Sequence, residues 1–512
     1  MSVIFENVNK FASLTPEKTA VIDSEGVKVS YKQLANLTKI RASRLSNLVI
    51  PNFSRIALCL NESIDTLVTI LALNILNATI IPLNPKLKSN QLQRFLKSVD
   101  AEVLIVESLT NSSFKDMINQ LKVIDLEMLQ NDNKVQNDSY SLRISNPQEY
   151  SQFLITLSSG STGDPKPIVF SENDKLKRSK QSVELYNVTH NDVILCASPF
   201  FHSLGQRLTF LPLLVGGTLV QLPVFGVQKW IDTVIKYQVT MTIPVSSHLH
   251  LLAGQLLKFP GKFKSLRCLV SSSASIDQSV KSSLFELPYC DFHEMYGASE
   301  IATATSLNKD EAKIKPNSIG FPCYGVEVRV VDENFIDCCP TTIGRIFVKS
   351  YLASSGYYNL PNTTEKSFVN GYFLTGDLGY LDIDGFLYFV DREKDVIIVG
   401  GVNIYPSDIE DVISRHIMVK ASVVVGAHDL YFGELPVAII ACNPDDKVSI
   451  ENELRVTLRK ELSSKQQPIM FFFQEKMPFS PSGKVDRKLI RDQIDSLGLD
   501  LSRRLRNTQH MT

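Results

Sequence analysis

Short apolar runs alternate with longer amphipathic segments along the N-terminal part of the chain. Runs typical of buried strands lie at residues 55–60, 102–106, 193–197 and 266–271. Between them, residues 64–76 and 92–98 carry apolar positions at helical spacing. Because strands that alternate with helices form parallel sheets covered by helices, this pattern predicts an α/β fold.

After Gly320 the pattern changes to short strands separated by turn signals. Candidate strands lie at 326–331, 344–349 and 386–390, the last directly after the Asp384-Gly385 turn. Short strands at this spacing predict a smaller antiparallel unit of barrel type.

A charged break at residues 391–395 separates this unit from the rest of the chain. It is followed by an apolar run at 396–399, the Gly400-Gly401 pair and a helical pattern at 407–416. We place a domain boundary at this break, which gives domains at residues 1–391 and 392–512.

The longest apolar stretch covers residues 67–81. It is interrupted by Thr69, Asn74 and Asn77, and it is shorter than the roughly 20 residues that a membrane-spanning helix needs. We therefore expect a buried helix there and no membrane span.

Composition and charge narrow the class of protein. A chain of 512 residues exceeds the size of one hydrophobic core, so two or three domains are expected. Its 53 basic and 54 acidic side chains give no general attraction to nucleic acid or anionic membranes.

The eight cysteines contain no C-x-x-C pair, and the N-terminal MSVIFENVNK lacks the basic and apolar regions of a signal peptide. We expect a cytoplasmic protein with reduced thiols.

Residues 157–166 combine four hydroxyl side chains, two glycines and a lysine, directly after the apolar run at 153–157. Glycines let the backbone approach an anion, and successive N–H groups, hydroxyls and a lysine can hold its oxygens. The spacing excludes the G-x-x-x-x-G-K-[ST] loop of common nucleotidases. The segment predicts a strand that leads into a phosphate-binding loop of another kind.

Four further segments carry chemistry. Tyr296–Glu300 offers an aromatic ring, a hydroxyl and a carboxylate, and Thr375–Asp377 places an acid after a tight turn. Asp395 follows Arg392 and Lys394, and Ser480–Lys484 places a lysine on a turn near the C-terminus. Each segment taken alone is equally compatible with a solvated loop.

The order of these motifs is more specific. The chain resembles the adenylate-forming (ANL) superfamily, which includes acyl- and aryl-CoA synthetases, firefly luciferase and the adenylation domains of nonribosomal peptide synthetases. The resemblance covers nearly the whole chain. Five family motifs match in order, at residues 158–166, 296–300, 375–377, 391–406 and 478–487.

The resemblance implies a fold and a reaction. The fold has a large N-terminal domain of two α/β lobes plus a β-barrel, and a small mobile α+β C-terminal domain. The reaction joins a carboxylic acid to ATP, which gives acyl-AMP and pyrophosphate, and then transfers the acyl group to a thiol. ATP, Mg²⁺ and coenzyme A are the implied cofactors and co-substrates.

The resemblance also implies roles for individual residues. Lys484 would bridge the attacking carboxylate and the α-phosphate, and Glu300 would bind Mg²⁺. Tyr296 would stack on adenine, while Asp377 and Arg392 would bind the ribose hydroxyls. Ser299 and Gly297 belong to the same AMP-binding set. The phosphates would be held by Ser158, Ser159, Gly160, Ser161, Thr162, Gly163 and Lys166.

For the thiol step, the resemblance implies that the C-terminal domain turns about Lys394. The turn would bring Gly400, Gly401 and Asn403 over the adenylate, where they would line a channel for pantetheine. The competing interpretation of these residues is an ordinary glycine-rich turn after a strand.

Three positions depart from the family pattern. Ser158 and Ser299 stand where threonine is common, and both keep a hydroxyl. Pro167 stands where glycine is usual after the loop lysine, so it fixes φ and removes an N–H donor. Pro167 leaves open a third interpretation, a catalytically impaired homologue that binds a nucleotide or a partner.

The segment Ser198–Ser203 bears on the acid. It lacks the aspartate with which peptide-synthetase domains bind an α-amino group, and its Phe-His-Ser-Leu-Gly run resembles CoA synthetases. In those enzymes the histidine lines or gates the acid pocket, so His202 is a candidate and an acid without an α-amino group is favoured. A plain core histidine is the alternative. Serines at 246–247 and 271–273 make a polar or hydroxylated acid conceivable.

The signals for the thiol acceptor conflict. Residues 400–406 look like those of CoA ligases, whereas residues 483–488 look like adenylation domains that load a carrier protein. Both acceptors present a phosphopantetheine thiol, and from the short stretch after residue 488 we expect no fused carrier domain. The prediction is an acyl-CoA-forming ligase, with the loading of a free-standing acyl or peptidyl carrier protein as the alternative.

Overall fold

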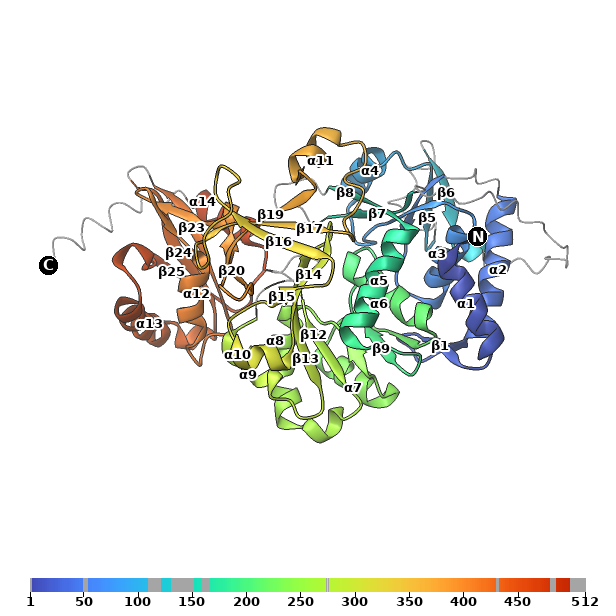
Figure 1. Cartoon of the computed structure of the whole chain (residues 1–512), viewed down its shortest axis with the longest axis horizontal. Helices are drawn as coiled ribbons and strands as arrows, with labels where there is room; N and C mark the ends of the chain where they lie inside the picture. Colours follow the sequence, from blue (N-terminus) through green and yellow to red (C-terminus); the bar gives the residue numbers. More distant parts are fainter. Residues whose placement is uncertain are drawn as a thin grey trace.

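A computed structural model of the chain describes residues 2–48, 54–108, 121–129, 152–158, 166–272, 274, 276–429, 432–478 and 485–497. Two helix-covered sheets make up most of the N-terminal part, and the C-terminal unit lies at one end of the molecule (Figure 1). The α/β class predicted from the alternating pattern is confirmed.

The first sheet has six strands in the order β6-β5-β3-β4-β7-β8 and is parallel except for β8, which pairs antiparallel with β7. Its strands are β3 (Arg55–Cys59), β4 (Thr79–Pro82), β5 (Val103–Val106), β6 (Lys122–Asp125), β7 (Gln152–Leu157) and β8 (Pro167–Ser171). Its connections include α3 (Ile64–Ile75), α4 (Ser89–Ser98) and the short η2 (Glu127–Leu129). The hairpin β7–β8 encloses the predicted phosphate-binding loop.

The apolar stretch at 67–81 is not one helix, so that prediction is wrong in its second half. Helix α3 ends at Ile75, and strand β4 begins at Thr79. Between them Asn77 has a φ of +54°, a left-handed conformation that asparagine tolerates better than most residues. The Ala78 N–H then donates to the Leu73 carbonyl and closes the helix end.

The second sheet has nine strands in the order β15-β14-β13-β12-β11-β9-β10-β1-β2. Strands β1, β10, β9, β11, β12 and β13 run parallel, and β2, β14 and β15 are antiparallel. The strands are β1 (Thr19–Ile22), β2 (Lys28–Ser30), β9 (Val193–Cys196), β10 (Thr218–Gln221), β11 (Met241–Thr242), β12 (Cys268–Ser271), β13 (Asp291–Ala298), β14 (Ala302–Leu307) and β15 (Phe321–Pro322).

Helices fill the space between the two sheets and cover the outer face of the second one. The largest apolar core combines residues of both sheets with the inner helices α1 (Val3–Leu14), α2 (Tyr31–Asn47), α3, α5 (Glu172–Tyr186) and α6 (Ser203–Val215). A second core lies under α7 (Val227–Tyr237), α8 (Ser246–Lys258), η3 (Pro260–Phe263), α9 (Gln278–Phe285) and α10 (Lys309–Ile314). Trp230 of α7 is fully buried in it.

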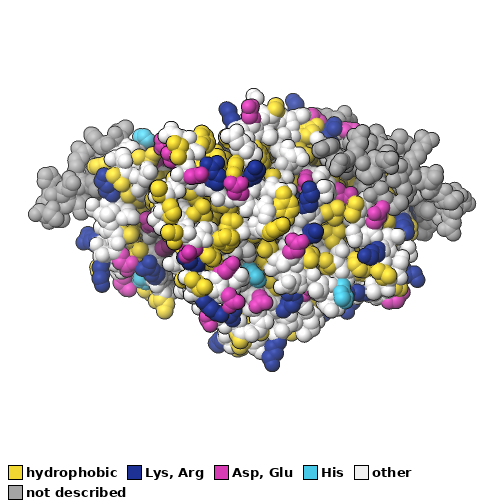
Figure 2. Space-filling view, viewed as in Figure 1, with side chains coloured by type: hydrophobic (Ala, Val, Ile, Leu, Met, Phe, Trp, Pro, Cys, Tyr) yellow, Lys and Arg dark blue, Asp and Glu magenta, His cyan; other side chains and the backbone are white. Residues whose placement is uncertain are grey.

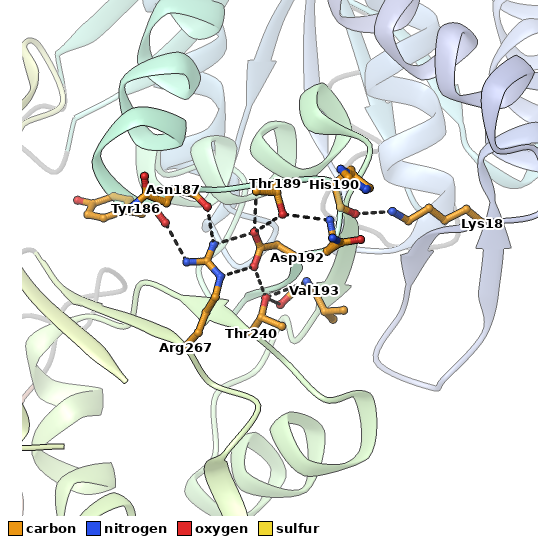
Figure 3. Close-up of polar contacts among 10 residues, drawn as sticks. Lys18, Tyr186, Asn187, Thr189, His190, Asp192, Val193, Thr240 and Arg267 are labelled. Atoms are coloured by element: carbon orange, nitrogen blue, oxygen red, sulfur yellow. Dashed lines mark hydrogen bonds and ion pairs between the residues drawn. The ribbon is translucent and has the colours of Figure 1, made fainter. Parts of the chain in front are cut away.

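An ion pair between a buried aspartate and a half-buried arginine joins the start of β9 to β12 (Figure 3). Arg267 Nη2 lies 2.7 Å from Asp192 Oδ2, and Asp192 also accepts from the Thr189 N–H and the Thr240 hydroxyl. Arg267 Nε also donates to Asp192, at Oδ1. Nη1 donates to the Tyr186 carbonyl and Nη2 to the Asn187 carbonyl, at the end of α5. This network fixes α5 against the second sheet.

A third sheet is antiparallel, with the order β16-β17-β19-β18 and with β20 paired to β19. Its elements are β16 (Val326–Val331), β17 (Gly344–Ser350), α11 (Pro361–Ser367), β18 (Phe368–Val369), β19 (Tyr372–Leu381) and β20 (Leu387–Arg392). The antiparallel unit predicted after Gly320 is thus present. Among the described residues its pairing is open, so closure into a barrel stays a prediction.

The C-terminal unit has its own sheet and its own apolar core, which runs from Ile397 to Ile494. The sheet order is β22-β21-β24-β23, with β25 paired to β24. Its elements are η4 (Glu393–Asp395), β21 (Ile397–Val399), β22 (Val402–Ile404), α12 (Pro406–Ser414), β23 (Ala421–Asp429), β24 (Gly433–Ala441), η5 (Pro444–Asp446), α13 (Lys447–Glu461), η6 (Ser464–Gln466), β25 (Met470–Gln474) and α14 (Arg487–Ser496). The boundary at residue 391 and the mobility of this unit stay predictions.

The surface and the thiols agree with the composition. Figure 2 shows basic and acidic side chains interspersed over the visible face. All eight cysteines are free thiols. Within the described parts of the chain, none of the helices combines the length and the apolar character that crossing a bilayer requires.

Candidate active site

Three strands bring Tyr296, Asp377 and Arg392 together. The Tyr296 hydroxyl donates to Asp377 Oδ2 at 2.7 Å, and Arg392 Nε lies 3.2 Å from Asp377 Oδ1. Asp377 and Arg392 are partners across the β19–β20 ladder, while Tyr296 comes from β13 of the second sheet. The cluster therefore lies where the second and third sheets meet, and it presents an aromatic ring, a carboxylate and a guanidinium together.

The protonation of Tyr296 is fixed by its surroundings. Burial, followed by the negative charge of Asp377, raises the pKa of the Tyr296 hydroxyl well above its ordinary value. Tyr296 therefore stays neutral and acts as a donor to the carboxylate. Asp377 remains an acceptor held between a hydroxyl and a guanidinium, which is suitable for binding a diol.

Glycine is required beside Tyr296. The register of β13 and β14 shifts between Tyr296 and Gly297, and a Cβ at Gly297 would lie 1.9 Å from the Ala302 carbonyl oxygen. A side chain there would push the strands apart. Gly376 lies within β19 rather than in the tight turn expected from the sequence, beside a register shift in the β17–β19 pairing. Its φ is +72°, and the Thr375 hydroxyl accepts from the Asp377 N–H.

Glu300 lies buried four residues after Tyr296. Its Oε1 accepts from the Tyr357 hydroxyl at 2.9 Å. Lys166 Nζ lies 5.1 Å from the centre of the Tyr357 ring, so Tyr357 lies beside both the predicted metal ligand and the predicted phosphate-binding lysine. The structure thus brings Lys166 and Glu300 to one place.

The two ends of the predicted phosphate-binding loop are joined by the β7–β8 hairpin. The Ser158 N–H donates to the Lys166 carbonyl at 2.9 Å, and the Lys166 N–H donates to the Ser158 hydroxyl at 3.1 Å. Pro167 is the first residue of β8, a position at which a strand tolerates proline. The loop residues between them, Ser159, Gly160, Ser161, Thr162 and Gly163, lie outside the described residues.

Arg178 of α5 was not predicted from the sequence, yet it supports the whole Tyr296–Glu300 segment. Its guanidinium is buried and donates to the carbonyls of Ser299 at 2.6 Å and Glu300 at 2.9 Å. It also donates twice to the Leu352 carbonyl. The signal that could have revealed it is a basic residue on the inward face of a helix.

His202 is the N-cap of α6, and the loop before it is held by Glu62 and by Gln206 of α6 itself. Glu62 Oε1 accepts from the Phe200 N–H at 2.5 Å, and Gln206 Nε2 donates to the Phe200 carbonyl at 3.0 Å. Burial raises the pKa of Glu62 to about 7, although the Phe200 hydrogen bond opposes this. Neither Glu62 nor Gln206 was predicted from the sequence.

One of the serines that suggested a polar acid, Ser246, has a structural partner, whereas the buried Ser271 hydroxyl has none among the described residues. The Ser246 hydroxyl donates to the Ser272 carbonyl at 3.0 Å. Nearby, His248 stacks on Phe225 with ring centres 3.5 Å apart, and burial lowers the pKa of His248 to about 4. The Ser246 hydroxyl thus bonds to the backbone, as serines in such loops often do.

The residues predicted for the thiol step lie on the C-terminal unit. Gly400 and Gly401 form the left-handed turn between β21 and β22, with φ of +54° and +78°, and Asn403 pairs with Ile398 beside it. A Cβ at Gly400 would meet Phe432 and Lys465 of the same unit, and one at Gly401 would meet nothing within 4 Å. All three residues therefore lie on the β21–β22 hairpin of the C-terminal unit.

Lys394 lies in η4, directly after the last strand of the N-terminal part. Just before Lys394, Asp391 Oδ2 accepts from the N–H of Ser407 in the C-terminal unit. Further along, the Ser414 hydroxyl of α12 donates to Asp277 at the start of α9 in the N-terminal part. These contacts connect the two parts of the molecule. Lys484 lies outside the described residues.

The site fits a nucleotide and one metal ion. Among the described residues, no group of three or more histidine, cysteine or acidic side chains could hold a metal alone. Mg²⁺ commonly uses one or two carboxylates, with phosphate oxygens and water for the rest. A single buried carboxylate near the predicted phosphate-binding lysine fits that pattern.

Comparison with known proteins decides the family. The family model described as AMP-binding enzyme matches residues 8–358. The chain belongs to the AMP-binding enzyme family. A second model, the AMP-binding enzyme C-terminal domain, matches residues 408–484, so both parts of this AMP-binding enzyme have relatives within the family.

Curated relatives of this AMP-binding enzyme include 2-succinylbenzoate–CoA ligases. The protein from Bacillus pumilus is 29% identical over 488 residues, covering 94% of this chain and 96% of the relative. The one from Bacillus subtilis is 28% identical over 486 residues, covering 94% and 96%. The alignments therefore span both chains nearly from end to end.

Solved structures show the same fold. The o-succinylbenzoate-CoA synthetase from Bacillus subtilis, in complex with its acyl-adenylate intermediate, has a TM-score of 0.83 at 26% identity and covers 95% of this chain and 98% of that one. The same synthetase has also been solved with ATP and a magnesium ion. An anthranilate-CoA ligase with a TM-score of 0.86 at 20% identity, covering 97% and 98%, supports the fold alone.

Proposed function

We propose that this protein is an ATP-dependent carboxylic acid ligase that forms an acyl-AMP and pyrophosphate and then an acyl-CoA thioester. The observation that carries the proposal is the meeting of two groups on residues 296–300, which form the end of β13 and the turn after it. Tyr296 joins Asp377 and Arg392, and Glu300 joins Tyr357 and Lys166. One group suits a nucleoside and the other a metal-bound polyphosphate. The full-length relatives with this activity support the same conclusion.

The nucleotide-binding side chains would act as follows. The Tyr296 ring stacks on adenine, while Asp377 accepts from the ribose hydroxyls and Arg392 donates to them. Lys166, together with the loop residues Ser158–Gly163, binds the β- and γ-phosphates. Glu300 holds Mg²⁺, which neutralises phosphate charge when it is bound.

In the first half-reaction, a carboxylate oxygen of the acid attacks the α-phosphorus of ATP. The new O–P bond forms as the bond to the bridging oxygen breaks, and pyrophosphate leaves. The acid and the triphosphate are both anions, so positive charge must lie where they meet. We assign that charge to Lys484 and Lys166.

In the second half-reaction, the CoA sulfur attacks the acyl carbon. A C–S bond forms, the C–O bond to AMP breaks, and the thiol proton goes to solvent. We assign Gly400, Gly401 and Asn403 to this step, after rotation of the C-terminal unit about Lys394.

The structure weakens the argument for a carrier protein as acceptor. The carrier-type motif at 483–488 includes Arg487, which is an internal residue of the C-terminal unit. Arg487 Nη2 lies 2.6 Å from Glu410 Oε2, and Nη1 donates to the Val424 carbonyl. A structural role therefore accounts for Arg487, and CoA is the acceptor that we propose.

The acid that we propose is an aromatic dicarboxylic acid of the 2-succinylbenzoate type, since relatives across the whole chain are named for it. The test measures pyrophosphate release with ATP and Mg²⁺ over a panel of carboxylic acids that includes 2-succinylbenzoate. We expect release only when an acid is present, and a CoA thioester in mass spectra once CoA is added. Release that needs no acid, or transfer to a holo-carrier but not to CoA, would contradict the proposal.

The impaired-homologue interpretation rests on Pro167 alone. Pro167 begins β8, where its missing N–H removes no hydrogen bond of the hairpin that is described. A failure of turnover across the whole acid panel, with ATP still bound in calorimetry, would restore that interpretation. The cytoplasmic location stays a prediction.

A further inference from the structure

Helices α5 and α6 bring three cationic side chains together in the interior of the N-terminal part. Lys175 and Arg178 of α5 are 4% and 3% exposed, and Arg207 of α6 is half-buried beside them. Between the helices lies a cavity of about 10 Å³, close to the space that one water occupies. Its lining consists of these three residues with Ser179, Ser203 and Phe210.

None of the three cations has a carboxylate partner among the described residues. Lys175 Nζ donates to the Gln206 side-chain oxygen at 2.7 Å and lies 3.5 Å from the centre of the Phe170 ring. Arg178 donates only to backbone carbonyls, and Arg207 Nη1 donates to the Thr303 hydroxyl at 2.9 Å. Neutral groups accept from the cluster, so its positive charge is not cancelled.

Buried like charges without a counter-charge are costly, and the cluster shows this cost. Burial, reinforced by its cationic neighbours, lowers the pKa of Lys175 well below its ordinary value. Burial and Arg207 lower the pKa of Arg178 to about 9, and burial also lowers the pKa of Arg207. All three groups would bind a proton more firmly with an anion beside them.

The acidic groups near the cluster are already engaged. Asp174 raises the pKa of both Lys175 and Arg178, but its Oδ2 accepts from the Ser171 N–H and caps α5. Glu300 raises the pKa of Arg178, but its carboxylate faces Tyr357 and the proposed metal. Neither lines the cavity among the described residues.

We propose that Lys175, Arg178 and Arg207 form a binding site for one small monovalent anion, a halide or a carboxylate group. The lining offers an ammonium, two guanidinium groups and two hydroxyls, all of which can donate. A water would have to direct its own hydrogens at these donors, whereas an anion accepts from all of them. The anion would supply the counter-charge that the protein lacks there.

Two sources share this chemistry. The first is a free anion such as chloride. The second is the second carboxylate of a dicarboxylic substrate, because Ser203 of the cavity directly follows His202. This second source rests on the proposed function, whereas the first does not.

The free-anion arm measures the unfolding temperature of the full chain at fixed ionic strength, with chloride or bromide replacing a bulky sulfonate such as MOPS. We expect a saturable rise of about 2 °C for the wild type. Lys175→Met, which keeps the length of the side chain, should abolish the rise. Lys180→Met is the matched control, because Lys180 lies on the same helix with its side chain 77% exposed. Arg207→Gln is a second test variant, in case Lys175→Met fails to fold.

The substrate arm compares 2-succinylbenzoate with the two analogues in which one of its carboxylates is a neutral carboxamide. We expect the wild type to prefer the diacid in kcat/KM by about tenfold or more over the analogue that lacks the second carboxylate. Lys175→Met should lose that preference, and Lys180→Met should keep it.

The outcomes separate the sources. A halide response without a diacid preference supports a free-anion site, and a diacid preference lost in Lys175→Met supports a substrate subsite. A bromide peak between α5 and α6 in anomalous diffraction would support the halide directly.

Two results together would overturn the proposal. Halides would give no specific response, and the diacid preference would be absent or would survive in both test variants, which would mean that the cavity holds only water. If no acid is activated at all, the proposed function fails while the halide arm still decides the anion site.

Discussion

At the scale of single residues, the charge of Asp377 is the most specific feature of the nucleotide cluster. Asp377→Asn keeps the size of the side chain and an oxygen for the Tyr296 hydroxyl, but it removes the attraction to Arg392. Because hydrogen bonds to a charged group contribute about 1.5–3 kcal/mol, we expect kcat/KM for ATP to fall by about 10-fold to 100-fold. The KM for the acid should change little. Pyrophosphate release at varied ATP measures both.

Asp337→Asn is the matched control, because it also removes one negative charge that pairs with an arginine of the third sheet. Asp337 is 64% exposed and lies beside Arg329 of β16. It should leave the ATP kinetics unchanged. Equal kinetics in the wild type and Asp377→Asn would remove Asp377 from the nucleotide site.

The same scale shows what a sequence can and cannot reveal about a site. Tyr296, Asp377 and Arg392 stand in motifs whose order predicts their meeting, and the structure brings them together. Arg178 and Glu62 belong to no such motif. Their partners are backbone groups more than 100 residues away in the chain, and the local pattern around a helix or strand end contains no information about them.

At the scale of elements, the Asp192–Arg267 pair should make the joint between α5 and the second sheet sensitive to acid. Burial acts to raise the pKa of Asp192, but hydrogen bonds from Arg267, Thr240 and Thr189 outweigh it and lower the pKa. A carboxyl group with a lowered pKa stabilises the fold above its ordinary pKa of about 3.9, and the stabilisation is lost as the pH falls through the lowered value.

The test is urea unfolding of Asp192→Asn and the wild type. At about pH 7 the variant should lose about 2 kcal/mol of unfolding free energy, a value discounted because Arg267 is partly exposed. At about pH 3 the difference should shrink. The exposed Asp232 provides the control Asp232→Asn, which should match the wild type at both values. A deficit that does not depend on pH would rule out titration of Asp192 as its cause.

Elements were predictable where one local signal dominates. Buried parallel strands such as β3 and β5 read as continuous apolar runs, because both of their faces are covered. The stretch at 67–81 was misread because hydropathy stays high through α3 and β4, while a single left-handed Asn77 separates them. Closure of the third sheet depends on pairing between distant strands, and no local pattern specifies that.

At the scale of the whole molecule, the proposed mechanism assigns the two half-reactions to two orientations of the C-terminal unit. Lys484 serves the first orientation, and the Gly400–Gly401 turn serves the second. The turn lies on the β21–β22 hairpin, and a side chain at Gly400 would meet residues of its own unit. The proposed second orientation therefore uses a rotation about the segment that contains Lys394. Two substitutions should therefore damage opposite halves of the reaction.

Lys484→Ala should reduce acid-dependent pyrophosphate release by about 100-fold to 1000-fold, because it removes a donor aimed at charge in the transition state. The same variant should still convert added acyl-AMP and CoA to thioester at close to the wild-type rate.

Lys394→Pro should behave in the opposite way, because proline fixes φ at the point of rotation. Pyrophosphate formation in a single turnover should persist while thioester formation falls by at least about tenfold. The exposed Lys488→Ala is the control for both variants, since it removes a lysine next to the motif without touching either step. If both variants lose the same half-reaction, a single fixed orientation performs both steps, and the assignment of Lys394 as the hinge fails.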